Sequence, residues 1–319
     1  MNNMKVSVIV PVFNQEPYIC DTLNSIINQD FEDYEIIVID DGSKDKSLEI
    51  IHETLDASDI PNTIIHHKNH GVSYSRNKGI DTASGDIIVF VDGDDIISPN
   101  HLKNLYNPDY DFSLVQLEKV ENAIKSKAFS YDENLSNPKE FIKKELLMEI
   151  PFNFCQLSYK RDLIIKNNIR FPENVIYGED TYFALKALIH GANIHISNEV
   201  SYSYTQHSQS AIKTSQLKRL DIVWVFERLS QYYQKNNQLE LANLVKTSRI
   251  PKAIFGNMNY FFTNNYDFDE IMAKIREIDG FNKLSKFKGS FKFKLKIKLF
   301  LISPKIYYKL WMRFKNSID

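Results

Sequence analysis

The chain has 319 residues, more than the roughly 100–200 that are typical of one domain, so we expect one large or two modest domains. Hydrophobic residues make up 43%, and Gly and Pro contribute 10 each, which excludes collagen-like, disordered and low-complexity classes. Two distant cysteines, Cys20 and Cys155, exclude a disulfide framework and favour a reducing compartment. The first 20 residues lack an export signal and no window approaches about 18 apolar residues, so we expect neither export nor an integral membrane protein.

Charge is distributed unevenly along the chain. Residues 281–319 contain ten Lys and one Arg against a single acid, a net charge of +10. Residues 1–280 contain 28 basic and 40 acidic residues, a net charge of −12. A basic tail of this kind favours an anionic partner. Because the rest of the chain is acidic, we expect that partner not to be a nucleic acid.

Short β-branched runs alternate with helical patterns over the first hundred residues, which predicts βαβ units on a parallel sheet. The expected strands are 6–10, 35–40, 63–66 and 87–91, and the expected helices are 19–29, 45–55 and 72–81. The pattern is mixed from 100 to 205 and almost wholly helical beyond 215. We therefore predict a catalytic α/β domain over 1–212 and a helical C-terminal region over 213–319.

The basic tail, 281–319, has two further features. Residues 291–299 alternate between apolar side chains and Lys, which is the period of a strand, although we favour a helix here. The mixture of cations and aromatic residues is typical of a segment at an anionic membrane surface. The alternatives are a solvated tail or a contact that makes a homo-oligomer. The aromatic residues expected to enter the membrane are Phe291, Phe293, Phe300, Tyr307, Tyr308 and Trp311.

Acidic clusters follow two of the predicted strands. Asp40-Asp41 ends one strand, and Asp92-Gly93-Asp94 follows the strongly apolar run 87–91. Ligands of open parallel sheets bind beyond the carboxyl ends of strands. Two carboxylates separated by Gly suit Mg²⁺ or Mn²⁺ beside a diphosphate, so these positions favour a nucleotide site over a solvated acidic turn. The first strand is followed by PVFNQEP, with no GxGxxG or Walker loop.

Five motifs occur in a fixed order: VSVIVPVFNQEPYI, EIIVIDDGSKDKS, NHGVSYSRNKGI, GDIIVFVDGDD and YGED at 177–180. Together they resemble the nucleotide-sugar-dependent glycosyltransferases of family 2, and the similarity extends to about residue 210. The resemblance implies the GT-A fold, in which a Rossmann-like mixed sheet is flanked by helices. It also implies an inverting, metal-dependent glycosyltransferase with a UDP-sugar donor and Mn²⁺ or Mg²⁺.

The resemblance assigns binding roles to individual residues. Pro11, Phe13 and Glu16 would lie against the nucleotide, and Asp41 would accept a hydrogen bond from uracil. Arg76 would meet the nucleotide or its diphosphate, and Asp92 the ribose or sugar. Asp94 would bind the metal, with Asp92 and His207 as further ligands. Ser210 would lie near the diphosphate with His207.

The resemblance makes Asp180, preceded by Glu179, the catalytic base. The alternative is that both are acidic residues favoured by a helix N-terminus. His66, His67 and His70 look like a metal cluster, but we interpret them as structural. The chain departs from the family pattern at Thr205, where an Arg is common, and at Cys155-Gln156-Leu157, where Asn-Lys-Leu is common.

The implied reaction is a single displacement that would turn a UDP-α-sugar into a β-glycoside, with a hexosyl or N-acetylhexosaminyl group transferred. The resemblance implies a cell-surface glycan, lipid-linked or teichoic-acid acceptor, and a peripheral enzyme on the inner face of a bacterial membrane. A nucleotidyltransferase is the first alternative, but it would need a Gly/Lys-rich loop after the first strand. An inactive sugar- or membrane-binding homologue is the second, and the intact Asp41, Asp92, Asp94 and Asp180 argue against it.

Overall fold

The computed structural model describes residues 5–121, 124–126, 128–206 and 217–314. The chain divides into two compact units. Unit 1 comprises 1–141, 151–174 and 179–210, and unit 2 comprises 142–150, 175–178 and 211–319. The predicted α/β fold with a mixed sheet, flanking helices and a helical C-terminal region is confirmed. Unit 2 also takes two short pieces from the first part of the chain, which the predicted boundary at 212 does not include.

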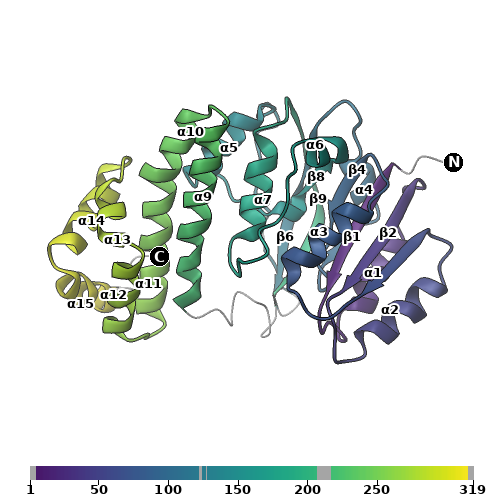
Figure 1. Cartoon of the computed structure of the whole chain (residues 1–319), viewed down its shortest axis with the longest axis horizontal. Helices are drawn as coiled ribbons and strands as arrows, with labels where there is room; N and C mark the ends of the chain where they lie inside the picture. The colour runs from purple at the N-terminus through teal and green to yellow at the C-terminus, as the bar shows by residue number, and fades with distance from the viewer. Residues whose placement is uncertain (1–4, 122–123, 127, 207–216, 315–319) are drawn as a thin grey trace. The chain divides into compact units, whose positions relative to one another are not determined.

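Unit 1 is built on a nine-stranded mixed sheet (Figure 1). The strand order is β3-β2-β1-β4-β8-β6-β9-β5, and β7 pairs with β6. Strands β1 to β4 are parallel to one another, whereas β8 is antiparallel to both β4 and β6. The strands are β1 Val6–Val12, β2 Tyr34–Asp40, β3 Asn62–His66, β4 Ile87–Phe90, β5 Ile96–Ile97, β6 Phe112–Glu121, β7 Ile124–Lys125, β8 Leu157–Lys160 and β9 Ile194–Gln206.

The parallel half of the sheet sets the position of the acidic clusters. Strands β1 and β4 are buried along their whole length, as expected of β-branched runs in a parallel sheet covered on both faces. Val12 at the end of β1 lies opposite Asp40 at the end of β2. Ile9 of β1 lies opposite Phe90 at the end of β4. The segments that follow β1, β2 and β4 therefore leave the same edge of the sheet.

Helices α1, α2 and α3 connect these strands, close to the predicted ranges. Helix α1 buries Ile19, Leu23 and Ile26 at helical spacing, and α3 packs on β1 and β2. Helix α5 runs from unit 1 into unit 2 at Phe141. The helical elements up to residue 188 are α1 Ile19–Ile27, α2 Ser47–Asp56, α3 Val72–Thr82, α4 His101–Leu105, α5 Pro138–Leu146, η1 Phe154–Gln156, α6 Arg161–Lys166 and α7 Glu179–Leu188.

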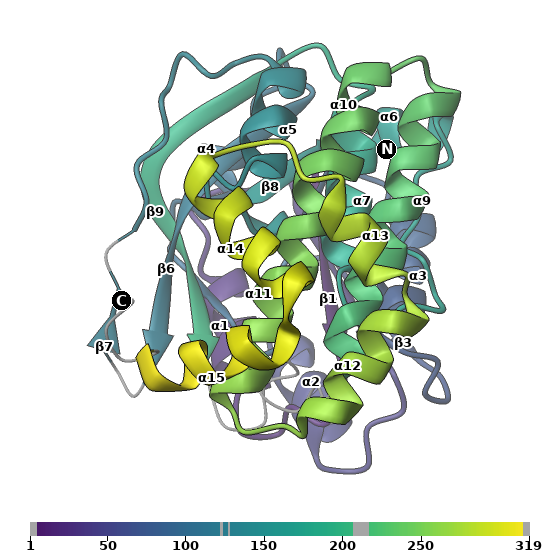
Figure 2. The same ribbon diagram turned by 90° about the vertical axis from the view of Figure 1, so that its left-hand side faces the viewer.

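The described part of unit 2 is helical, and Figure 2 shows α13, α14 and α15 facing the viewer. The segment that alternates between Lys and apolar residues forms a helix, as predicted. Across the described residues, no helix is both long and apolar enough to cross a bilayer. The elements are η2 Leu217–Asp221, α9 Ile222–Lys235, α10 Leu239–Leu244, η3 Val245–Arg249, α11 Ile250–Thr263, α12 Phe268–Glu277, α13 Gly280–Ser285, α14 Phe291–Ile302 and α15 Pro304–Phe314.

A π-helical segment, η3, joins α10 to α11 without a break. Pro251 lies at the start of α11 and has no N–H, so it cannot donate to the carbonyl of Thr247 four residues earlier. That carbonyl accepts a hydrogen bond of 2.7 Å from the backbone N–H of Lys288. The turn that leads into α14 is therefore attached to the α10–α11 helix.

The basic tail packs on the rest of unit 2 through its aromatic residues. Phe300 and Tyr307 are buried, and Phe300 stacks on Phe281 with ring centroids 5.6 Å apart. Tyr307 donates a hydrogen bond to Asn259. Phe293, Tyr308 and Trp311 also contact aromatic rings of unit 2. Of the six aromatic residues predicted to enter a membrane, Phe300 and Tyr307 are buried, so that prediction is wrong for these two. Phe291 is exposed, and Phe293, Tyr308 and Trp311 are half-buried, so for these four it stays a prediction.

Candidate active site

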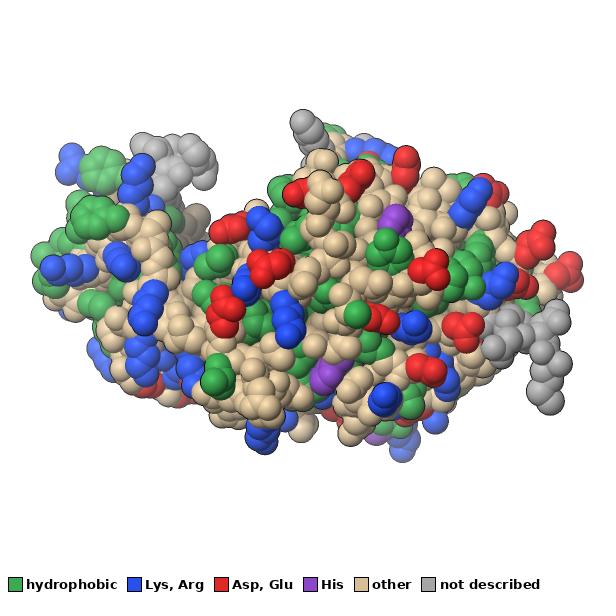
Figure 3. Space-filling view, turned by 90° about the horizontal axis from the view of Figure 1, so that it is seen from above, with side chains coloured by type: hydrophobic (Ala, Val, Ile, Leu, Met, Phe, Trp, Pro, Cys, Tyr) green, Lys and Arg blue, Asp and Glu red, His purple; other side chains and the backbone are tan. Residues whose placement is uncertain are grey.

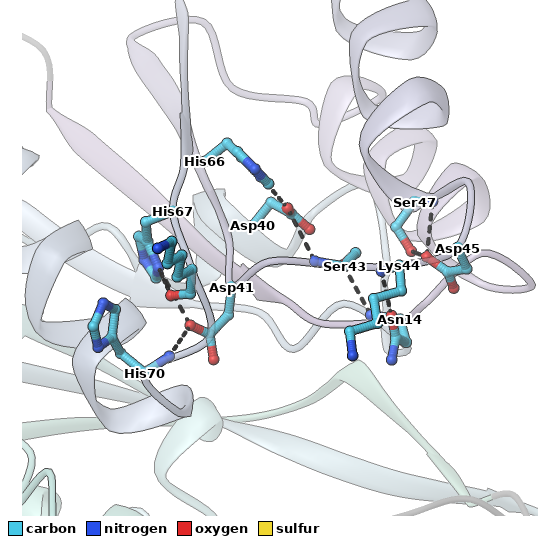
Figure 4. Close-up of polar contacts among 11 residues, drawn as sticks. Asn14, Asp40, Asp41, Ser43, Lys44, Asp45, Ser47, His66, His67 and His70 are labelled. Atoms are coloured by element: carbon cyan, nitrogen blue, oxygen red, sulfur yellow. Dashed lines mark hydrogen bonds and ion pairs between the residues drawn. The ribbon is translucent and has the colours of Figure 1, made fainter.

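The loop after β1 is held against the turn after β2. Pro11 is buried at the end of β1, whereas Phe13 and Glu16 are exposed. Asn14 donates its N–H to Ser43 Oγ and accepts the N–H of Lys44 at Oδ1, at 2.9 and 2.8 Å (Figure 4). Glu16 Oε2 accepts the N–H of Lys46 at 3.1 Å. These bonds place the predicted nucleotide loop beside the turn that carries Asp41.

Asp41 is buried where α3 begins. Its Oδ1 accepts the N–H of His70 at 2.7 Å (Figure 4), and its Oδ2 accepts the N–H of Gly71 at 2.8 Å. Gly42 has φ +75, and an added Cβ would lie 2.9 Å from the backbone at His67, so the turn requires glycine. Asp41 Oδ2 accepts the N–H of Gly71 and has a second lone pair, so the carboxylate can accept another donor there.

The three histidines near this turn contact its carboxylates and one another. His66 Nδ1 lies 2.6 Å from Asp40 Oδ2, and His67 Nδ1 lies 3.3 Å from Asp41 Oδ1. The rings of His67 and His70 both pack on Tyr74. Within the described ranges, no group of three or more His, Cys, Asp or Glu residues is placed to hold a metal ion. These contacts support a structural role for the histidines.

The acidic turn after β4 lies close to the end of β1. The N–H of Asp95 donates to the carbonyl of Asp92 at 3.0 Å, which closes the turn. An added Cβ at Gly93 would lie 3.2 Å from the Pro11 carbonyl oxygen, and Thr22 Oγ1 donates to the Gly93 carbonyl. Glycine therefore allows the close approach. Asp92 and Asp94 remain half-buried at this edge.

Two carboxylates with hard oxygen atoms fit a divalent cation that arrives with its nucleotide. Mg²⁺ is commonly bound by one or two carboxylates together with substrate phosphates, rather than by a cage of protein ligands. The half-buried Asp92 and Asp94 would supply the protein ligands of such an ion. The described residues thus fit a metal site that the diphosphate completes.

Asp95 was not identified from the sequence, although it anchors the acidic turn. It is 1% exposed, and its carboxylate accepts the Tyr202 hydroxyl at 2.6 Å and the Thr205 N–H at 2.8 Å. Burial, followed by the charges of Asp92 and Asp94, raises its pKa well above the usual value. Asp95 therefore ties the turn to strand β9. Tyr202 and Asp95 are 107 positions apart in the sequence, so their spacing gives no signal of this contact.

Arg76 on α3 joins the acidic turn to the start of α7. It is 5% exposed, and its guanidinium donates to Asp92 Oδ1 at 2.8 Å and to Glu179 Oε1 at 3.2 Å. The guanidinium carbon also lies 4.4 Å from the centroid of the Phe154 ring. Although burial opposes the charged form, the carboxylates of Asp92 and Glu179 raise the pKa of Arg76. Its predicted contact with the nucleotide stays a prediction.

The predicted base lies in the first turn of α7. Asp180 is half-buried, and its Oδ1 accepts the N–H of Thr181 at 2.5 Å. Glu179 is nearly buried, and burial, then the charge of Asp180, raises its pKa to about 7 in spite of Arg76. The helix N-terminus favours negative charge at both positions. The predicted base thus lies next to the carboxylate that Arg76 connects to Asp92.

Cys155 lies at one of the positions where the chain departs from the family pattern. It is buried, and its Sγ lies 3.9 Å from Asp92 Oδ2. Burial, followed by the charge of Asp92, raises the pKa of the thiol well above the usual value, so it is protonated and can donate to Asp92. Asp92 therefore contacts Arg76 through one oxygen and Cys155 through the other.

The predicted His207 and Ser210 lie outside the described residues.

Comparisons with known proteins identify similar chains. Residues 7–165 match the sequence model described as Glycosyl transferase family 2. EpsH of Bacillus subtilis (strain 168), which is named as a glycosyltransferase, is 29% identical over 75% of this chain and 72% of its own length. The cholesterol galactosyltransferase of Borreliella burgdorferi is 30% identical over 69% of this chain and 64% of its own length.

The third relative is TarS of Staphylococcus aureus (strain MW2), a poly(ribitol-phosphate) beta-N-acetylglucosaminyltransferase. It is 28% identical over 65% of this chain, and the match spans only 37% of TarS. The crystal structure of S. aureus TarS 1–349 in complex with UDP-GlcNAc superposes with a TM-score of 0.73 at 19% identity. That superposition covers 98% of this chain and 92% of the TarS fragment, which shows that the two share a fold.

Proposed function

The chain belongs to glycosyltransferase family 2, and on this premise we propose that it is an inverting enzyme that transfers a sugar from a UDP-sugar to an acceptor hydroxyl. The observation that carries the proposal is the bridge from Asp92 through Arg76 to Glu179. This bridge connects the acidic turn, at the edge where a nucleotide would bind, to the helix that carries Asp180. A donor and a base can therefore meet in one site.

In this proposal Asp180 takes the proton of the acceptor hydroxyl as that oxygen attacks C1 of the sugar. One in-line attack inverts the anomeric centre, so a UDP-α-sugar gives a β-glycoside. Asp41 receives the uracil, and the loop with Pro11, Phe13 and Glu16 lies along the nucleotide. A divalent ion held by Asp94 and Asp92 would neutralise the charge of the departing diphosphate.

The acceptor is proposed from the chemistry of the relatives. TarS is named for poly(ribitol-phosphate) and another relative for cholesterol, so sugar transfer to a polymer and to a membrane lipid both occur among similar proteins. We propose a cell-surface glycan, lipid-linked or teichoic-acid-type acceptor, and transfer of a hexosyl or N-acetylhexosaminyl group. Such acceptors would place the enzyme on the inner face of a bacterial cell membrane.

The test is release of UDP from UDP-glucose, UDP-galactose and UDP-GlcNAc, with Mn²⁺, with Mg²⁺ or with EDTA. We expect release from one donor, dependent on a metal ion. Asp94→Ala should abolish most metal-dependent UDP binding, whereas the matched control Asp59→Ala removes an exposed carboxylate of the α2–β3 loop and should change nothing. UDP binding by Asp94→Ala with unchanged Mn²⁺ dependence would contradict the metal assignment. Release of pyrophosphate from a nucleoside triphosphate and a sugar phosphate would favour a nucleotidyltransferase.

A further inference from the structure

Helices α14 and α15 each expose apolar side chains along one arc of the helix surface. Three residues of α14 and three of α15 form this surface, which we call the outer face. At about 100° per residue, each set of three falls within an arc of about 80°. On α14 the buried Ile297 and Phe300 lie opposite the exposed arc, and on α15 the buried Tyr307 lies beside it. The outer face consists of Phe291, Leu295, Ile302, Ile306, Leu310 and Phe314, which are 39–79% exposed.

Cations surround these apolar residues. The basic residues of the two helices are all exposed, and the sequence has no acidic residue from 281 to 318. Figure 3 shows hydrophobic and basic side chains intermingled at its left, over this part of unit 2. Isolated exposed apolar residues are normal, but six on two helices that contact each other suggest a binding partner. The basic residues are Lys292, Lys294, Lys296, Lys298, Lys305, Lys309 and Arg313.

We infer that the outer face docks on a bilayer that contains anionic lipid. Apolar side chains that enter the boundary between headgroups and acyl chains, with lysines at the headgroups, describe an interfacial helix. Anionic lipid supplies both the negative charge and the apolar phase. A soluble polyanion would leave the six apolar side chains in water.

A second copy of the chain fits this surface less well. A symmetric dimer through the outer face would place the same seven cations opposite one another. Like charges that meet across an interface are unfavourable, and Lys is depleted from protein–protein interfaces. The charge of the outer face therefore favours lipid over self-association.

The outer face would be the membrane contact of an enzyme whose proposed acceptors include membrane lipids. Its binding to lipid does not depend on which donor the enzyme uses or which residue is the base. Its test is co-sedimentation of the full chain with vesicles of phosphatidylcholine, with or without phosphatidylglycerol. One variant replaces all six outer-face residues with Ser and keeps every charge. A second replaces Lys292, Lys294, Lys298 and Lys305 with Gln. The control, Ile124→Ser with Leu239→Ser, removes exposed apolar residues elsewhere.

We expect the wild type and the control to bind vesicles with phosphatidylglycerol and the serine variant to lose most of that binding. Each Lys→Gln change should weaken binding by roughly fivefold at low salt, and added salt should weaken the wild type. Equal binding by the wild type and the serine variant would overturn the inference. A dimer in sedimentation analysis without vesicles that the serine variant loses would overturn it in favour of self-association. UDP release without vesicles is measured in parallel and should be the same for the wild type and the serine variant. An absence of UDP release from both would contradict the proposed donor and would leave the vesicle result unaffected.

Discussion

The carboxyl edge of the sheet in unit 1 and the outer face in unit 2 are both rich in charged residues. They differ in burial and in whether opposite charges lie together. At the sheet edge, Arg76 is buried between the carboxylates of Asp92 and Glu179. On the outer face, seven cations are exposed in a stretch with no acidic residue. A buried charge is stable only when a counter-charge of the same fold pairs with it. A cluster of exposed like charges can instead be neutralised by a binding partner of opposite charge. The first arrangement is that of a preformed site, and the second is that of a surface that meets a partner.

The strongest test of the preformed site is Asp180→Asn, which removes the predicted base and keeps the shape of its side chain. Turnover should fall by roughly 10²–10⁴-fold, the usual contribution of general-base catalysis. Binding of UDP-sugar should remain near normal, because the substituted residue is not among the proposed donor ligands. Turnover is measured as UDP release with acceptor present, and binding by calorimetry. Full turnover by the variant would assign the base to another residue.

The compensation of charge around Arg76 is tested by Arg76→Met. Loss of the cation leaves Asp92 and Glu179 without a counter-charge, and breaking a buried pair costs about 3–5 kcal/mol of unfolding free energy. Arg76→Lys should be intermediate, because an ammonium cannot reproduce the fork that contacts both carboxylates. Urea unfolding measures the difference. The matched control is Arg170→Met, which breaks the more exposed pair with Asp81 and should cost at most about 1 kcal/mol. Similar losses at the two positions would show that the Arg76 pairs add little.

The two sides of α14 are compared by Phe300→Ala and Leu295→Ala. Phe300 is fully buried, and its truncation should cost about 3–5 kcal/mol of unfolding free energy. Leu295 is exposed, so its truncation should change that free energy by less than about 0.5 kcal/mol. Thermal and urea unfolding give both values. Vesicle binding, compared between the folded fractions of the two variants, should show the reverse order. Leu295→Ala should lose more binding than Phe300→Ala.

Glu179 gives a smaller effect that depends on pH. Its folded pKa of about 7 lies above its usual 4.5, so the folded state binds more protons between these values. The contribution of Glu179 to stability is therefore greatest below pH 4.5 and is lost as pH rises to about 7, by up to roughly 3 kcal/mol. Glu179→Gln should lack this component. The measurement is the difference in unfolding free energy between the wild type and the variant at pH 5 and pH 7.5, and a difference independent of pH would contradict the expectation.

Much of the fold of unit 1 was predictable because its central strands are fully buried runs of β-branched residues. Val6–Val12 and Ile87–Phe90 show this, and each ends at the segment that the motifs mark as functional. The segment 291–299 was harder, because its alternation has the period of a strand and gives no clean apolar face at the period of a helix. Its helical form is explained by packing that the sequence does not display, since Ile297 and Phe300 are buried against unit 2.

The candidate site was predictable as a list of residues and not as a network. Asp92, Arg76 and Glu179 were each singled out, but the sequence gives no sign that one guanidinium joins residues 16 and 103 positions away. Asp95 was missed because its partner, Tyr202, lies 107 positions away. Cys155 was noticed as a departure from the family pattern, and its contact with Asp92 became visible only in the fold.

The hydrogen bond between Lys288 and Thr247 has a consequence for hydrogen exchange. An amide in a short turn normally exchanges with solvent deuterium as fast as the turn fluctuates. The amide of Lys288 instead donates to a carbonyl inside a helix, one that Pro251 cannot use. Its exchange should therefore follow the opening of the α10–α11 helix, and the protection of this single turn amide should report how firmly the start of α14 is held.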